Sequence, residues 1–177
     1  MIPTAGTATP RRSVLLDFGD DAEITQWMAV NDVVMGGMSA SAFEPAGPGI
    51  ARFRGMVSLE NSGGFASVRT SPRRWNSSGA SAFLLRVLGD GHAYKFTVRT
   101  DDGFDGVQYQ SRFAPPAGAW YEARLPVESF AATFRGRIVP GPGPLDPARV
   151  RALGLTISDR QAGPFELLVD WIGVETG

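Results

Sequence analysis

The stretch HAYKFTVRT, residues 92–100, decides the fold because its residues alternate between two sides. One side holds His92, Tyr94, Phe96 and Val98, and the other holds Ala93, Lys95, Thr97 and Arg99. A second alternating stretch, VQYQSRF (107–113), follows the sequence DDGFDG (101–106). Alternation with period two is typical of a strand with one buried face, and Asp-Gly pairs favour tight turns. The two stretches are therefore predicted to form an antiparallel hairpin with one shared polar face.

Further short strands are predicted along the rest of the chain, separated by turns rich in Gly and Pro. They are SVLLDF (13–18), ARFRGMVSLE (51–60), GFASVRTS (64–71), SAFLLRVLG (81–89), AWYEARLPV (119–127), RALGLTIS (151–158) and PFELLVDWIGVE (164–175). Many short strands with little helix predict an all-β fold, an antiparallel jelly-roll β-sandwich with one or two short helices. We assign residues 1–12 to a loose leader and residues 13–177 to a single domain.

Two segments carry helical signals. DDAEITQWMAV (20–30) can form a short amphipathic helix with Ile24, Trp27 and Met28 facing inward. In LDPARVRAL (145–153), Asp146 can cap a helix that begins at Pro147. Trp27 and Trp171 are assigned to the core, and the last strand is expected to point Phe165, Leu167, Val169 and Trp171 the same way.

The composition excludes several classes of function. The 177 residues carry a net charge of −1, which gives no drive toward nucleic acid. The chain has no cysteine and one histidine, His92, so thiolate chemistry is excluded and a Ser-His-Asp triad would need His92. No apolar run is long enough to span a membrane. The first residues lack the pattern of a signal peptide, so the expected location is the cytoplasm.

No catalytic or cofactor motif is complete. We expect no cofactor and no metal, although a cation on the acidic turn 101–106 stays open because only an EF-hand is excluded by its spacing. His92 is expected to be a packed or rim histidine. The remaining catalytic alternative is a hydrolase with paired carboxylates, and the candidates are Asp101, Asp102, Asp105, Asp159, Glu166 and Asp170.

A candidate binding surface follows from the predicted hairpin. Its polar side, together with a tryptophan in a loop, gives the set Trp75, Lys95, Arg99, Gln108, Gln110 and Arg112. Such a face could receive a protein partner or, with exposed aromatic rings, a carbohydrate.

Two loops repeat one pattern, a polar pair followed by glycines. In NDVVMGGMS (31–39) the candidate residues are Asn31, Asp32, Met35, Gly36, Gly37 and Ser39, and in ENSGGF (60–65) they are Glu60, Asn61, Gly63, Gly64 and Phe65. We expect the two loops to meet, with Arg69 paired to Asp32 or Glu60 and Met35 plugging the core beneath. Whether the loops are structural or line a site stays open.

Several long motifs in order resemble those of the Complex I intermediate-associated protein 30 family. They are WMAVNDVVMGGMSAS (27–41), GMVSLENSGGFASVR (55–69), DGFDGVQYQSRF (102–113) followed by WYEARLPVESF (120–130), and LTISDRQAGPFELLVDWIGV (155–174). The resemblance implies a galactose-binding-like jelly roll and a role in assembling respiratory complex I. Since the chain carries no mitochondrial-type transit segment, it looks bacterial, and cytoplasmic or peripheral to the inner membrane.

The resulting functional hypothesis is a non-enzymatic scaffold that binds complex I subunits or assembly factors. The alternative is a carbohydrate or small-ligand module, and the carboxylate hydrolase comes third.

Overall fold

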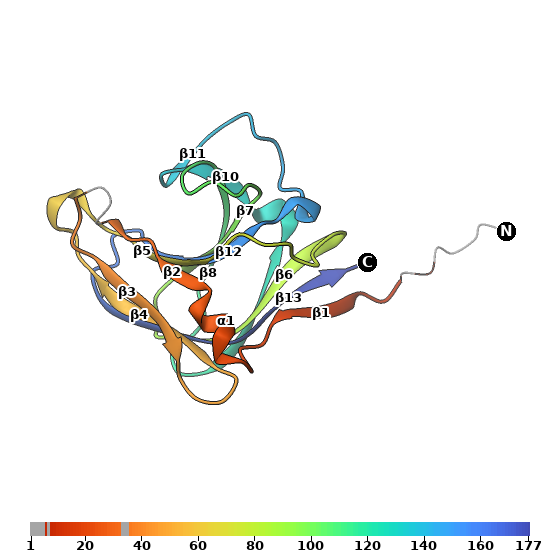
Figure 1. The fold of residues 1–177 in the computed structure, drawn as a ribbon, viewed down its shortest axis with the longest axis horizontal. Helices are drawn as coiled ribbons and strands as arrows, with labels where there is room; N and C mark the ends of the chain where they lie inside the picture. The colour runs from red at the N-terminus through yellow and green to blue at the C-terminus, as the bar shows by residue number, and fades with distance from the viewer. Residues whose placement is uncertain (1–5, 7, 33–35) are drawn as a thin grey trace.

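The computed structural model describes residues 6, 8–32 and 36–177, which form two antiparallel β-sheets packed against each other (Figure 1). One sheet has the order β3-β4-β13-β6-β9, with β1 also paired to β13. Its strands are β1 (Arg11–Leu16), β3 (Ala40–Pro45), β4 (Ala51–Val57), β6 (Ala80–Leu88), β9 (Trp120–Pro126) and β13 (Gly163–Thr176). The predicted all-β sandwich is confirmed.

The second sheet has the order β11-β10-β8-β7-β12-β5-β2. Its strands are β2 (Trp27–Ala29), β5 (Ala66–Thr70), β7 (Tyr94–Arg99), β8 (Gln108–Phe113), β10 (Ala131–Phe134), β11 (Arg137–Ile138) and β12 (Ala152–Ile157). The predicted hairpin is β7 and β8, in which Lys95 pairs with Arg112 and Thr97 with Gln110. Figure 1 shows that the sheet curves, with β10 and β11 rising at one end.

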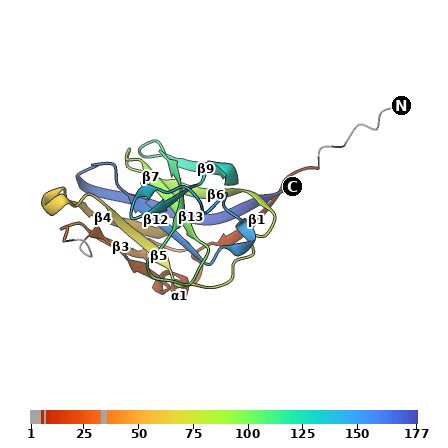
Figure 2. The ribbon, with the colours of Figure 1, turned by 90° about the horizontal axis from the view of Figure 1, so that it is seen from above.

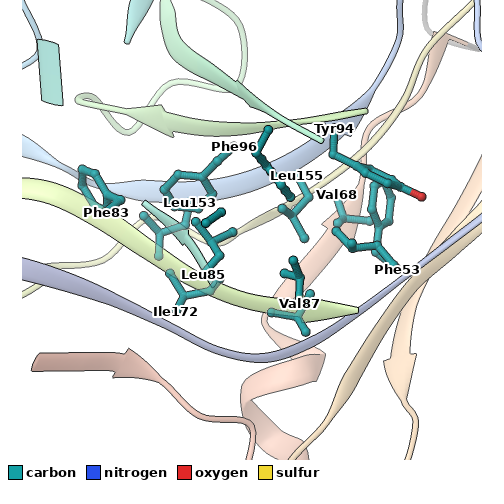
Figure 3. Packing of buried hydrophobic residues seen from close by; sticks show 14 of the residues in the cluster. Phe53, Val68, Phe83, Leu85, Val87, Tyr94, Phe96, Leu153, Leu155 and Ile172 are labelled. Atoms are coloured by element: carbon teal, nitrogen blue, oxygen red, sulfur yellow. The ribbon is translucent and has the colours of Figure 1, made fainter. Parts of the chain in front are cut away.

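The core lies between the two sheets, and aromatic rings hold it together (Figure 3). Phe83 of β6 lies 5.4 Å from Phe96 of β7, measured between ring centres, and Phe53 of β4 lies 6.2 Å from Tyr94 of β7. All four side chains are fully buried. These contacts span the two layers, so each sheet buries its apolar side only in the presence of the other.

The first strand begins at Arg11, two residues before the predicted start of the domain. Arg11 pairs with Thr176 and Arg12 with Glu175, so β1 runs beside the end of β13 (Figure 2). The two arginines are exposed and carry no apolar alternation, and only the pairing with β13 makes them part of a strand.

Both predicted helical segments contain helical turns, but these are shorter than predicted. Helix α1 (Asp21–Thr25) is capped by Asp20 and buries Ile24, but the chain then enters β2. Trp27 is buried as predicted, whereas Met28 faces outward and is 45% exposed because strand residues alternate. Asp146 caps a single 3-10 turn, η4 (Pro147–Arg149). The segments η2 (Glu60–Ser62) and η3 (Val127–Ser129) are also 3-10 turns.

The prediction for Trp171 is wrong because β13 contains a bulge. The pairing of β13 with β6 shifts register between Val169 and Trp171, where one extra residue is inserted. The core side of the strand therefore continues through Ile172, which is fully buried, while Trp171 is only half-buried.

Candidate functional site

The two glycine-containing loops meet at Asp32, whose side chain is fully buried. Its carboxylate accepts hydrogen bonds from the Ser39 amide at 2.9 Å and the Ser39 hydroxyl at 2.6 Å. It also accepts from the amides of Gly64 at 2.7 Å and Phe65 at 3.3 Å. Asn31 makes a parallel link, since its side-chain oxygen accepts from the Ser41 hydroxyl and the Ser67 amide. The predicted meeting of the loops is confirmed.

Two glycines lie so close to the Asp32 carboxylate that no side chain would fit at their positions. A Cβ atom on Gly37 would lie 2.3 Å from the Asp32 carboxyl carbon, and one on Gly63 would lie 2.6 Å from an Asp32 oxygen. Real side chains do not approach that closely. Gly37 of the first motif and Gly63 of the second are therefore required by the buried acid.

The electrostatics of Asp32 match a structural role. Burial raises the pKa of Asp32, but the hydrogen bonds from Ser39, Gly64 and Phe65 outweigh burial, and the pKa lies below its ordinary value. Ser39 is also buried, and its hydroxyl accepts from the Ser58 amide at 3.0 Å. The contacts with Ser39 close the first loop, and those with Gly64 and Phe65 tie it to the second.

The expected partner of Arg69 is wrong. Arg69 lies on the opposite side of its strand from Val68 and donates to the carbonyl oxygen of Phe104 at 2.6 Å. Asp32 is saturated by loop donors, and Glu60 is exposed. Asn61 is exposed at φ 53°, inside the turn η2. The expected plug, Met35, falls outside the described residues, while Gly36, with φ 90°, is exposed.

A row of polar side chains lines the outer side of the second sheet, as the hairpin predicts. We call this surface the polar face; it comprises Ser67 and Arg69 of β5, Lys95, Thr97 and Arg99 of β7, Gln108, Gln110 and Arg112 of β8, and Gly154 and Thr156 of β12. Strand register places these residues side by side. Gln108 and Gln110 are half-buried and Arg112 is exposed, whereas Arg99 is 4% exposed.

Trp75 is not an exposed platform. Its side chain is half-buried against the core, and its indole donates to the Arg151 carbonyl at 3.1 Å. The Arg73 guanidinium lies 4.0 Å from its ring centre. The loop position suggested exposure, but the indole packs against the core.

The loop 101–106 folds back over Arg69 and Arg99 instead of projecting into solvent. The Phe104 carbonyl oxygen accepts from Arg69 at 2.6 Å and from Arg99 at 3.1 Å. The Arg69 guanidinium also lies 4.7 Å from the centre of the Phe104 ring, which is 61% exposed. Phe104 was missed as a site residue, although an aromatic residue inside an otherwise polar turn is a signal that could have found it.

The acidic residues proposed for hydrolysis each lie beside a basic side chain. Asp101 pairs with Arg99, Asp102 with Arg151 and Asp105 with Arg135. Similar pairs join Lys95 to Asp159, Arg52 to Glu166 and Arg86 to Asp170. For Asp101, burial raises the pKa, but hydrogen bonds from Arg99 and Gly103 outweigh burial and the pKa lies below its ordinary value. A lowered pKa is opposite to what a general acid needs.

His92 is a rim residue, as expected. Its Nδ1 lies 2.9 Å from one oxygen of Asp90. The Asp90 carboxylate also accepts hydrogen bonds from the Tyr94 hydroxyl at 2.9 Å and the Glu166 amide at 2.7 Å. Within the described ranges, no group of three or more His, Asp or Glu side chains is arranged to hold a metal. Nor does that part of the chain contain a helix long and apolar enough to cross a membrane.

A wider open groove of about 640 Å³ lies on the outer side of the other sheet. It is lined by Ala40, Ser41, Ala42, Arg54, Gly55, Met56, Asp90, Pro164, Phe165 and Glu166. Two charged residues of the groove already have partners, because Arg54 pairs with Glu44 and Asp90 lies beside His92. Despite its size, this groove is a less suitable candidate binding site than the polar face.

Solved structures define the class of fold. The family 11 carbohydrate-binding module of a cellulosomal cellulase of Clostridium thermocellum has a TM-score of 0.68 at 14% identity, and the match covers 93% of this chain and 94% of the module. The module from that organism in complex with a β-1,3-1,4-mixed-linked tetrasaccharide has a TM-score of 0.66 at 15% identity, with 92% and 94% covered. The chain therefore has the β-sandwich fold of carbohydrate-binding modules, and at this identity the likeness concerns the fold alone.

The sequence comparisons define the family. The model of Complex I intermediate-associated protein 30 matches residues 16–169, and the chain belongs to this family. The mitochondrial member of Mus musculus is 29% identical over 187 residues, covering 92% of this chain and 56% of the relative. The member of Drosophila melanogaster is 23% identical, covering 92% and 62%. The chain thus spans little more than half the length of these relatives.

The expectation of a cytoplasmic protein is contradicted by these relatives. The matched proteins of mouse, fly and Neurospora crassa are all named mitochondrial, and the expected bacterial source also finds no support among them. The prediction relied on the character of the first residues, and the lack of a recognisable segment there carries no information about location.

Proposed function

We propose that this chain acts in the assembly of respiratory complex I by binding a protein partner, a complex I subunit or another assembly factor. Membership of the Complex I intermediate-associated protein 30 family carries this proposal. The role does not require catalysis, and the described carboxylates near the polar face lie beside basic side chains. We further propose that it works in mitochondria, as the names of its relatives indicate.

The polar face is the binding surface that we propose. Its exposed and half-buried side chains are long and capable of hydrogen bonding, and its margin carries two exposed apolar residues, Met28 and Phe104. Aromatic residues, Met and Arg are enriched at protein interfaces. The Asn31–Asp32 cluster is a less suitable surface, because its polar groups already bind one another.

The proposal is tested by affinity purification of tagged protein from detergent-solubilised mitochondria, with quantitative mass spectrometry. We expect enrichment of complex I subunits or assembly factors over a tag-only control. Arg112→Glu should reduce this enrichment, because its side chain on the polar face is 62% exposed. Arg54→Glu is the matched control, since its side chain is 55% exposed on the other sheet. Equal enrichment with both variants would contradict the assignment of the surface.

Carbohydrate binding is the alternative, and the likeness to carbohydrate-binding modules favours it. We rank it second because the strands β5, β7, β8 and β12 place no aromatic residue on the polar face, and stacking on aromatic rings is a common way of holding sugars. Retardation of the protein in gels containing mixed-linkage β-glucan, abolished by Phe104→Ala, would favour this alternative.

A further inference from the structure

A small cavity opens where the loop 101–106 meets the polar face. Its volume is about 110 Å³, and it is lined by Met28, Arg69, Thr70, Pro72, Arg99, Asp101, Asp102, Gly103, Phe104 and Ala152. A water molecule takes up roughly 30 Å³ in the liquid, so the cavity has room for a carboxylate group with one or two methylene carbons. Its walls combine two basic residues, Arg69 and Arg99, with two acidic residues, Asp101 and Asp102, and with the apolar side chains of Met28 and Pro72.

Among the described residues around this cavity, one basic side chain has no acidic partner. Asp101 binds Arg99, and Asp102 binds Arg151 at 2.6 Å. Arg69 has no carboxylate within ion-pair distance among the described residues. Burial and the nearby positive charge of Arg99 lower the pKa of Arg69 by more than the charges of Asp105 and Asp101 raise it. An incoming anion would relieve this repulsion.

The Phe104 carbonyl oxygen occupies the point on which the Arg69 and Arg99 donors converge, so an anionic oxygen would have to replace it there. Arg69 and Arg99 both donate to it, at 2.6 and 3.1 Å, so their N–H groups converge on a single acceptor. Arg99 is 4% exposed, and within the described part of the chain its Nε has no hydrogen-bond partner. A neutral carbonyl is a weaker acceptor for two guanidinium groups than a carboxylate.

We propose that Arg69 and Arg99 form a carboxylate-binding site on the polar face, which takes an acidic side chain of the protein partner. The identity of the partner as a protein rests on the proposed function, whereas the carboxylate chemistry rests on the cavity. The planar guanidinium of Arg69 suits a bidentate contact with such a group. Phe104 and Met28 pack beside the methylene carbons of the acidic side chain.

The carboxylate chemistry is tested on the purified chain with blocked glutamate, N-acetyl-glutamate methylamide, in an NMR titration at constant ionic strength. The matched probe is blocked glutamine. Blocked glutamate should shift the Nε–H signals of Arg69 and Arg99 and the amide signals of Gly103 and Phe104, and blocked glutamine should not. Arg69→Gln should weaken the binding by at least about tenfold, because it removes a charge-assisted contact. Arg112→Gln, on the same face, should change it little.

Arg69→Lys guards against a purely structural effect, because it keeps the charge and loses the fork-shaped donor set. It should bind the probe more tightly than Arg69→Gln and less tightly than the wild type. Unchanged thermal unfolding temperatures establish that the variants are folded. Equal shifts with the glutamate and glutamine probes, or equal weakening by Arg69→Gln and Arg112→Gln, would overturn the site.

The partner is tested separately in the affinity purification. Arg69→Gln should lower the capture of complex I subunits, and blocked glutamate should elute them where blocked glutamine does not. Capture that is unaffected by Arg69→Gln would overturn the assignment of the carboxylate to the partner. If the wild type captures no complex I protein at all, the proposed function fails, while the probe titration still decides the carboxylate site.

Discussion

Asp32 shows how one buried charge can organise two loops that are distant in the sequence. Four donors surround its carboxylate, and they come from Ser39, Gly64 and Phe65. A buried charge is costly unless it is fully hydrogen-bonded, and here both oxygens are satisfied. The acid therefore holds together the loop 31–39 and the loop 60–65, and through them the entrances to β3 and β5.

Removing this carboxylate should be severe. Asp32→Ala removes the acceptor of three backbone amides, those of Ser39, Gly64 and Phe65, and leaves the Ser39 hydroxyl only the Ser58 carbonyl. We therefore expect it to lower the free energy of unfolding by about 3–5 kcal/mol. Urea denaturation measures the loss. Asp21→Ala, in the exposed first turn of α1, is the control and should cost less than about 0.5 kcal/mol. A small effect at Asp32 would show that the loops are held by other contacts.

The same carboxylate gives a pH dependence with a definite sign. The pKa of Asp32 in the folded chain lies below its ordinary value of 3.8, which approximates the unfolded state. Its stabilisation is therefore fully present above the unfolded pKa and is lost as the pH falls through the folded pKa. The difference in unfolding free energy between wild type and Asp32→Ala should be constant at neutral pH and shrink below about pH 4. A difference that grows on acidification would reverse the assigned direction.

The residue scale also shows what the sequence could and could not predict. The motifs NDVVMGGMS and ENSGGF indicated that polar pairs and glycines would meet, and they do. The partner of Arg69 could not be predicted, because it depends on the loop 101–106 folding back from another strand pair. The local sequence of a hairpin turn does not show that the turn makes such a long-range contact.

At the scale of the elements, alternation predicted the strands. The prediction of which residues face the core failed where a bulge interrupts the alternation. β7 and β8 follow their pattern, and Tyr94, Phe96 and Val98 are fully buried. In β13 the bulge between Val169 and Trp171 reverses the sides, so that Ile172 replaces Trp171 in the core. The bulge arises from pairing with β6, which periodicity within β13 alone does not encode.

Close packing of β3 on β4 gives a prediction at the scale of the element. A Cβ on Gly55 would lie 2.0 Å from the Ala40 carbonyl oxygen, so Gly55→Ala must push the two strands apart. We expect a loss of about 1–3 kcal/mol of unfolding free energy, with faster hydrogen exchange of the β3 amides. Gly19→Ala is the control, because its added Cβ meets only the Asp17 side chain at 3.4 Å. Unchanged exchange in β3 would mean that the strand adjusts without loss of pairing.

At the scale of the whole molecule, the two sheets share one hydrophobic core. Trp27 stacks on Phe43 at 4.3 Å between ring centres, which joins the second sheet to the first. Such sharing predicts a single cooperative unfolding transition. Tryptophan fluorescence and far-ultraviolet circular dichroism should give coincident urea transitions. Separate midpoints would show that the sheets unfold independently.

The sequence motifs were sufficient for the family and for the β-sandwich, because they are spread over most of the chain. They could not identify the surface that meets a partner. The polar side of β7 and β8 was predicted from alternation, but the burial of Arg99, the position of Trp75 against the core and the cavity beneath Phe104 all depend on loops that approach from elsewhere.

Site-specific photo-crosslinking in mitochondria tests the central claim, that the polar face meets a complex I protein. A photoreactive phenylalanine analogue replaces Phe104, which is 61% exposed beside the polar face, and in a matched variant it replaces Tyr121 of β9, which is 39% exposed on the other sheet. We predict crosslinks from position 104 to a complex I subunit or assembly factor, and few from position 121. Crosslinks to such proteins from position 121 and none from position 104 would contradict the account.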